Sequence, residues 1–156
     1  QEIEDVKRQQ TTPEAIWMTN PGESNSIEAD NYPPSLYGNG RTNPTQNLVD
    51  AFPMANGYPI EDSRSGYDAK NPYVGRDPRL ALYVVLNEST QGSEGNTIVT
   101  GVYKDNNVDG LNKENKKSTR TGYYLRKLLR DDINLNTGTN QNHYVARIRY
   151  TEIFLN

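Results

Sequence analysis

The chain contains no long apolar segment, and its longest uninterrupted apolar run is Leu80–Leu86. Stretches rich in Gly, Pro and Asn separate the other apolar runs, and these residues favour turns and irregular backbone. Hydrophobic residues make up 33% of the chain, below the roughly 45–50%, glycine included, of average globular chains. We therefore expect one domain's length of chain with a thin core and many loops. No run approaches the ~20 residues of a transmembrane helix.

Charge and cysteine content exclude several classes of protein. The 17 basic and 20 acidic residues are interspersed and leave a net charge of -3, which argues against a nucleic-acid ligand. The absence of cysteine excludes a disulfide scaffold, a thiolate nucleophile and a cysteine-ligated metal. The first ten residues lack the basic and apolar regions of a signal peptide. The chain is therefore either a cytoplasmic protein or a piece of a processed or longer one.

Helix signals are short and local. Thr45 is a candidate N-cap for a helix of at most two turns, whose apolar face carries Leu48, Val49 and Phe52. Asp77 can cap a turn that Pro78 opens.

Both ends of the chain also carry helical patterns. Residues 1–12 are expected to end a preceding helix, and residues 144–156 to start a helix that returns to a larger scaffold. The apolar pattern at the C-terminal end includes Ile148 and Leu155 and has no terminating signal after it. We therefore expect the chain to be part of a longer protein.

Strand signals are fewer. Leu80–Leu86 is apolar, β-branched and aromatic, and it predicts a strand that is buried on both faces. A linker over Ser89–Asn96 leads to Thr97–Tyr103, the expected hairpin partner. Glu14–Met18 predicts a short buried strand or turn. Gly122–Leu129 fits a strand or a helix on periodicity alone, and we favour the strand.

Four sequence blocks follow one another along the chain. Pro44–Gly57 reads P-T-Q-N-L-V-D-A-F-P-M-A-N-G, and Asn71–Leu80 contains N-P-Y and R-D-P-R-L. Thr121–Lys127 begins T-G-Y-Y, and Arg149–Asn156 reads R-Y-T-E-I-F-L-N. In this order the blocks resemble the SusD/RagB family of outer-membrane nutrient-binding lipoproteins, over roughly residues 13–156.

The resemblance implies a mainly α-helical parent fold, much longer than this chain and built on tetratricopeptide-like helix pairs. This segment would be an irregular, loop-rich α+β subdomain with short helices and a small antiparallel sheet or hairpins, its loop-rich part spanning residues 13–143. The resemblance also implies a lipid-anchored cell-surface protein that binds oligosaccharide without catalysis and delivers it to a TonB-dependent, SusC-like transporter. Thr151 departs from the family's usual alanine, and no lipidated cysteine lies in this chain.

Loops rich in Tyr, Asn and Arg suit a sugar ligand. Sugar rings pack their C–H faces on aromatic rings, and their hydroxyls pair with amide, carboxylate and guanidinium groups. Residues 32–41 form the strongest cluster, and Tyr37 is the favoured contact in it. The alternative is a solvated loop whose tyrosines cover neighbouring elements. The candidate ligand contacts are Tyr32, Tyr37, Asn39, Arg41, Tyr58 and Tyr67.

Other conspicuous side chains are interpreted as structural. Trp17 is flanked by apolar residues and is expected in the core. The charged residues could recognise an acidic sugar, but pairing of guanidinium with carboxylate or with carbonyls at a helix C-terminus is the preferred interpretation. The residues interpreted in this way are Arg76, Asp77, Arg79, Arg149 and Glu152.

A partial calcium motif occurs at residues 105–110. Asp105, Asn107 and Asp109 occupy the first three oxygen-ligand positions of such a loop, and Gly110 its turn position. Lys116 stands where the bidentate glutamate belongs, which excludes a full-strength site. A hairpin turn built on Asp109 and Gly110 is preferred, a weaker calcium site stays open, and no other metal or cofactor is expected.

No motif for catalysis is present. His143, the lone histidine, lies in a polar stretch without a nucleophile or metal ligand at a recognisable spacing. A pair of carboxylates for glycoside hydrolysis is compatible with 20 acidic residues, although no motif points to one. The sequence thus predicts a glycan-binding protein, with a peptide-binding family member and a surface glycosidase as the alternatives.

Overall fold

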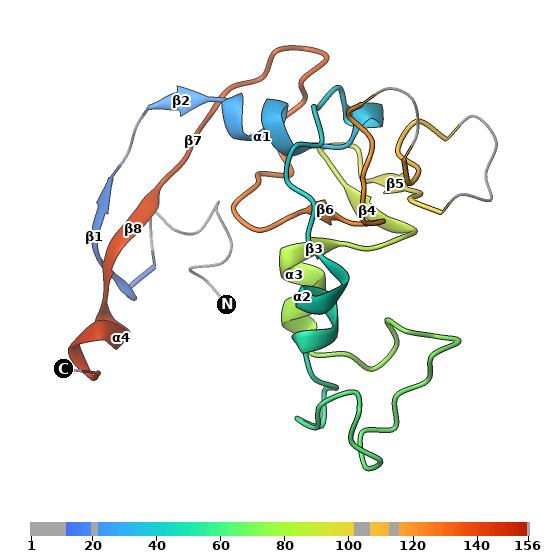
Figure 1. Cartoon of the computed structure of the whole chain (residues 1–156). Coiled ribbons are helices and arrows are strands. Elements are labelled where there is room, and N and C mark those ends of the chain that lie inside the picture. The colour runs from blue at the N-terminus through green and yellow to red at the C-terminus, as the bar shows by residue number, and fades with distance from the viewer. Residues whose placement is uncertain (1–11, 20–21, 102–106, 113–115, 156) are drawn as a thin grey trace.

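The computed structural model describes residues 12–19, 22–101, 107–112 and 116–155. Short helices and two-residue to five-residue strands form a body from which a two-stranded arm extends (Figure 1). In the described part of the chain, each sheet is an antiparallel pair of strands: β1 with β8, β2 with β7, β3 with β6, and β4 with β5. The expected irregular, loop-rich α+β fold is confirmed. The elements are β1 Ala15–Thr19, β2 Glu23–Ser24, α1 Ser26–Asn31, η1 Pro34–Leu36, α2 Gln46–Ala51, α3 Pro78–Tyr83, β3 Val84–Val85, β4 Ser89–Gln91, β5 Asn96–Ile98, β6 Tyr124–Leu125, β7 Gln141–Asn142, β8 Val145–Arg149 and α4 Tyr150–Ile153.

The first predicted helix is confirmed as α2. Thr45 Oγ1 accepts a hydrogen bond from Leu48 N at 3.3 Å, so the N-cap predicted from the sequence satisfies one of the free amides of the first turn. The helix buries Val49 and ends at Ala51, two residues before Pro53.

The predicted strand over Leu80–Leu86 is wrong for its first half. Pro78–Tyr83 is helix α3, because the Asp77 carboxylate caps it by accepting from Arg79 N at 2.8 Å and Pro78 presets the backbone of the first turn. Only Val84 and Val85 are in a strand, and both are buried as expected. An apolar run of this length does not by itself distinguish a helix from a strand. The Asp77 cap determines that Pro78–Tyr83 is helical.

The hairpin lies within the segment that the sequence suggested was a linker. Strand β4 pairs with β5 from Ser89↔Ile98 to Gln91↔Asn96. Gly92 and Gly95 bound the turn with φ of 84° and 63°, a backbone that costs glycine no steric penalty. The expected partner Thr97–Tyr103 overlaps β5 only at its start, and Val84–Val85 pairs with Tyr124–Leu125 instead.

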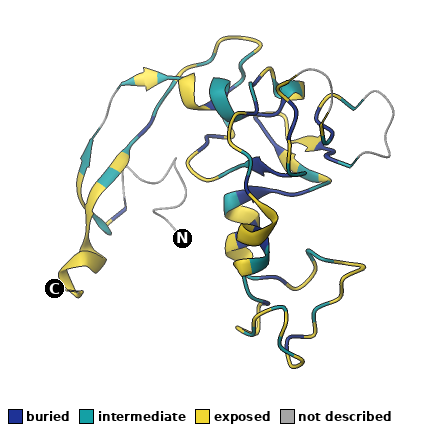
Figure 2. Ribbon diagram, in the orientation of Figure 1, coloured by how far each residue is buried: buried dark blue, intermediate teal, exposed yellow. Residues whose placement is uncertain are grey.

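The arm consists of β1 and β8. Trp17 pairs with Ile148 across it, and 57% of the residue is exposed, so the expectation that Trp17 is buried in the core is wrong for this chain. Within the helix expected over residues 144–156, Val145–Arg149 is strand β8 and only Tyr150–Ile153 is helical, as the single-turn α4. The arm is mostly half-buried or exposed along its length (Figure 2). The helix expected at residues 1–12 falls almost entirely outside the described residues.

The core consists of two small apolar clusters on either side of β3. Side chains alternate across a strand, so Val84 faces one cluster and Val85 the other. The first cluster contains Val49, Leu80, Val84, Leu86 and Tyr123, and the second contains Val85, Ile98 and Tyr124.

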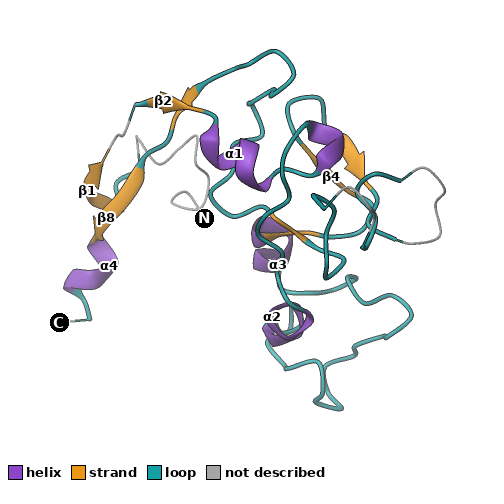
Figure 3. Cartoon of the chain, turned by 45° about the horizontal axis from the view of Figure 1, so that its top comes forward, coloured by secondary structure: helices purple, strands orange, loops and turns teal. Residues whose placement is uncertain are grey.

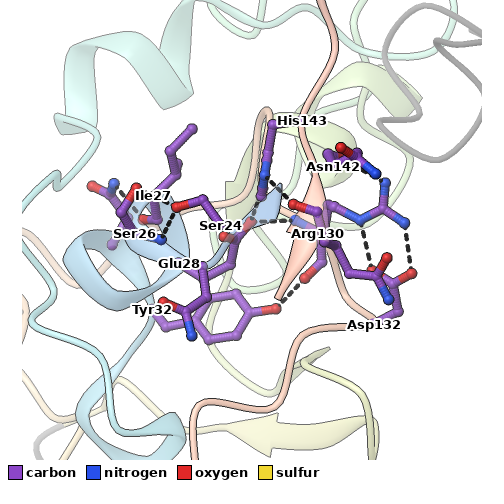
Figure 4. A network of polar contacts seen from close by, with 12 residues as sticks. Ser24, Ser26, Ile27, Glu28, Tyr32, Arg130, Asp132, Asn142 and His143 are labelled. Carbon is purple, nitrogen blue, oxygen red and sulfur yellow. Dashed lines mark hydrogen bonds and ion pairs between the residues drawn. The ribbon is translucent and has the colours of Figure 1, made fainter. Parts of the chain in front are cut away.

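A buried polar network joins α1 to the C-terminal third of the chain (Figure 4). Glu28 is 0% exposed, and its Oε1 accepts from Arg130 N at 2.9 Å and lies 2.9 Å from His143 Nε2. Tyr32 Oη donates to the Arg130 carbonyl. The Arg130 guanidinium contacts both carboxylate oxygens of Asp132, at 2.9 and 2.7 Å. These hydrogen bonds connect α1 to segments that lie more than 90 residues later in the chain.

We predict that Glu28→Ala lowers the free energy of unfolding by about 2–5 kcal/mol, because it leaves two buried nitrogen groups without an acceptor. Denaturant unfolding of the full-length protein measures this loss. Asp30→Ala on the same helix is the control, because it removes an exposed ion pair with Arg41 that contributes at most about 1 kcal/mol. Equal losses in the two variants would show that the network does not hold the fold.

Candidate functional site

A cavity of about 210 Å³ opens between three segments that are far apart in the sequence. Residues of η1 and its flanks form one wall, the β4–β5 turn forms the second, and residues 133–136 form the third. Figure 3 shows the 3-10 turn beside β4. The lining residues are Tyr32, Ser35, Leu36, Tyr37, Gly92, Ser93, Glu94, Asn96, Ile133, Asn134, Leu135 and Asn136.

The floor and walls of the cavity are fixed by close packing. Tyr32 and Ile133 are each 1% exposed. A Cβ at Gly92 would lie 3.1 Å from Leu36 Cδ1, so the hairpin turn and η1 are in tight contact. Asp109 Oδ1 accepts from Ser35 N at 2.8 Å and holds the η1 turn from its other side.

Tyr37 is the exposed aromatic ring of this cavity. It follows η1 with a left-handed backbone, φ 65°, and 64% of the residue is exposed. A non-glycine residue in this region is strained, and such strain concentrates at functional sites. Gly38 lets the chain turn here, since a Cβ at that position would lie 2.1 Å from the Tyr32 carbonyl oxygen. The turn therefore holds the Tyr37 ring in solvent at the edge of the cavity.

The cavity also offers polar groups that the protein does not use. Within the described residues, the side chains of Asn96, Asn136 and Ser93 make no hydrogen bond, and all three are exposed. Asn134 is already engaged, because its Oδ1 accepts from Asn136 N at 3.0 Å and its Nδ2 lies 3.4 Å from Glu94 Oε1. The free amides can donate to and accept from hydroxyl groups of a ligand.

The structure separates the other residues predicted from loop 32–41. Tyr32 is buried and donates its hydroxyl to the Arg130 carbonyl, so its ring is a packing element and is not available as a sugar platform. Asn39 and Arg41 follow in irregular backbone and lie outside the cavity lining. Arg41 pairs with Asp30 at 3.2 Å on the surface.

Tyr58 and Tyr67 lie elsewhere, in the loop between α2 and α3. This loop projects below the two helices in Figure 1, on the side away from η1 and β4. The Arg64 guanidinium lies 4.4 Å from the Tyr58 ring centroid, and that of Arg76 lies 5.7 Å from the Tyr67 centroid. The structure therefore does not bring these two tyrosines to the cavity, and each has a cationic neighbour of its own.

The residues interpreted as structural make contacts within the protein. Arg76 is 7% exposed and donates from Nη2 to the carbonyls of Val49 and Phe52, at 2.6 and 2.8 Å, where α2 ends. Asp77 forms a bidentate pair with Arg79, and these hydrogen bonds lower the pKa of the Asp77 carboxyl.

At the other end of the chain, Arg149 precedes α4 and Glu152 lies within it. Arg149 also pairs with Ala15 at the base of the arm.

The sequence did not reveal several cavity residues, nor the burial of His143 in the network around Glu28. The cavity side chains Ser93, Glu94 and Asn96 were assigned to a linker, and Asn136 to a loop; the only signal was the Asn- and Ser-rich composition of both segments. His143 was expected in a polar loop, yet it is 4% exposed and bound to Glu28, a contact that no local pattern reveals.

The calcium motif is described only in part, since Asp105 lies outside the described residues. Asn107 Nδ2 donates to the carbonyls of Val99 and Gly101, and Asp109 Oδ1 accepts from Ser35 N. Gly110 N donates to the Asn107 carbonyl at 3.3 Å, so a turn forms here, but its central residues are Val108 and Asp109 and it joins no described strand pair, unlike the expected hairpin turn. Among the described residues, no three acidic or histidine side chains gather as metal ligands.

We predict that Asp109→Asn raises stability at neutral pH and leaves it unchanged in acid. Burial raises the pKa of the Asp109 carboxyl, so the folded protein favours the protonated form and loses stability as the pH rises through that pKa. The amide of the variant would keep an acceptor for Ser35 N without this loss. Unfolding free energies measured from pH 3 to pH 7 test the sign.

Asp68→Asn is the opposite-sign control, because hydrogen bonds from Lys70 N and Asn71 lower the pKa of Asp68. That variant should lose stability at neutral pH relative to acid. A parallel response of the two variants would contradict the assignment.

We also predict that Tyr37→Gly leaves the free energy of unfolding unchanged or raises it by up to about 1 kcal/mol. Glycine removes the left-handed strain but has more freedom to lose on folding. Tyr150→Gly, in the helical backbone of α4, should instead lower stability by roughly 0.5–1 kcal/mol, from lost helix propensity and from the lost ring contact with Phe154. Thermal unfolding of the three proteins checks this, and a clear loss for Tyr37→Gly would show that the ring contributes to the fold.

The family comparison determines what kind of chain carries this cavity. The model of the SusD family matches residues 5–156. The chain belongs to the SusD family. The resemblance of the four sequence blocks is thereby confirmed.

Solved structures share the fold. A SusD-like carbohydrate binding protein from Bacteroides fragilis NCTC 9343 superimposes with a TM-score of 0.76 at 21% identity, over 99% of this chain and 30% of that one. A SusD-like protein from the same organism gives a TM-score of 0.71 at 23% identity, over 99% and 34%. This SusD-family chain thus spans about a third of the length of these structures. Among curated proteins, none matches it.

Every helix in the described part of this SusD-family chain is too short to span a bilayer.

Proposed function

We propose that this chain contributes a glycan-binding site to a SusD-type receptor. The observation that carries the proposal is the Tyr37 ring, held exposed beside an amide-lined cavity in a chain of this family. One structural neighbour is described as a carbohydrate binding protein. In this reading the receptor binds its ligand without catalysis.

The chemistry of the cavity suits a sugar. The Tyr37 face can cover the C–H patch of a sugar ring, while Asn96 and Asn136 offer both donors and acceptors to its hydroxyls. The cavity volume, about 210 Å³, is below the roughly 300–1,000 Å³ of pockets that enclose whole ligands. A single sugar unit therefore occupies the cavity, and the rest of the glycan extends over the surface.

The proposal extends to the receptor as a whole. Membership of the SusD family supports a lipid-anchored protein at the outer-membrane surface that delivers the bound oligosaccharide to a TonB-dependent, SusC-like transporter. The lipid anchor would lie outside this chain, which contains no cysteine.

Calorimetry of the full-length protein against a panel of polysaccharides and oligopeptides tests glycan binding. We expect at least one glycan to bind, and Tyr37→Ala to weaken it about tenfold or more, since loss of a buried aromatic contact costs upward of about 1–2 kcal/mol. Tyr150→Ala, at a tyrosine that is 52% exposed on α4, is the matched control and should bind normally. Binding of oligopeptides alone, or silence across all glycans, would contradict the proposal.

A further inference from the structure

The cavity wall carries a negative charge and no positive one. Among the described residues that line it, Glu94 is the single charged side chain, and neither lysine nor arginine is present. Glu94 Oε1 has one weak partner, Asn134 Nδ2 at 3.4 Å, and within the described chain its Oε2 has none. The carboxylate of Asp131 lies behind the same turn and accepts from Gly92 N at 3.4 Å.

The guanidinium groups of the neighbouring segments hydrogen-bond to protein acceptors, although Arg126 Nε is buried without one among the described residues. Arg126 Nη2 donates to the Thr90 carbonyl and lies 3.4 Å from Ser89 Oγ. Arg130 pairs with both oxygens of Asp132 and donates from Nη1 to the Asn142 carbonyl at 3.1 Å. Neither arginine lines the cavity, so neither is placed to neutralise an anionic ligand group.

We propose that the cavity accepts an uncharged sugar unit and discriminates against units that carry a carboxylate or a sulfate. This inference rests on the proposed glycan binding and adds the charge class of the ligand.

The discrimination follows from what Glu94 can and cannot do. A sugar hydroxyl donates to the free Glu94 oxygen and still accepts from Asn96 or Asn136. An anionic group has no proton to donate and meets a like charge at short range, and the neutral amides do not compensate that repulsion. Because the site is open to solvent, added salt screens part of the effect.

The experiment compares glycans that share a backbone and differ in charge. Full-length protein is titrated with a neutral polysaccharide and with its uronate or sulfated counterpart, at low and high ionic strength. We expect the neutral member of the best-binding pair to bind at least about tenfold more tightly at low salt, a ratio that shrinks as salt is added. Equal or tighter binding of the acidic member would overturn the inference.

Substituting Glu94 tests whether its carboxylate is the group that discriminates against acidic glycans. Glu94→Gln keeps the shape and a hydrogen-bond acceptor, so it should bring the acidic glycan closer to the neutral one and change neutral binding little. Glu61→Gln changes the net charge equally from the loop between α2 and α3, away from the cavity, and should leave the ratio unchanged. If both variants shift the ratio alike, net charge and not Glu94 selects the ligand, and the inference fails. If neither glycan class binds wild-type protein, the proposed function fails and this inference falls with it, whereas loss of charge selectivity alone leaves glycan binding intact.

Discussion

The structure depends on one buried carboxylate. Glu28 is fully buried, and its Oε1 accepts a hydrogen bond from Arg130 N and contacts His143 Nε2. These contacts fix α1 to the segment that precedes β8. A chain with so few hydrophobic residues cannot position long loops by core packing alone. The same network holds the Tyr32 ring, which is the floor of the cavity, through the Arg130 carbonyl. A polar anchor therefore sets the position of the loops from which the site is built.

Local signals in the sequence predicted the elements they control. Thr45 and Asp77 cap α2 and α3 as expected, because a cap depends on residues within one turn. The strand predicted from the apolar run after Asp77 was wrong for its first half, since apolar character alone fits a helix and a strand equally well. The prediction for Trp17 was wrong for another reason: its apolar neighbours predict burial, whereas the strand that carries it is half-buried to exposed in this chain.

The candidate site was predictable only in part. Composition singled out loop 32–41, because its glycines and prolines leave little room for core packing, and the family resemblance favoured Tyr37 within it. It could not bring residues of the β4–β5 turn and of loop 133–136 to that ring, since their proximity depends on contacts across most of the chain. The Glu28–His143 pair shows the same limit, with partners 115 positions apart.

That separation also has a consequence during synthesis. Ribosomes add roughly 5–20 residues per second, so Glu28 emerges on the order of 10 s before its partner 115 positions later. Until then α1 has no anchor, and contacts of such long range form slowly even in a complete chain. The nascent segment must therefore stay soluble by its polarity alone, and the scarcity of apolar residues that makes the finished core thin protects the unfinished chain from aggregation.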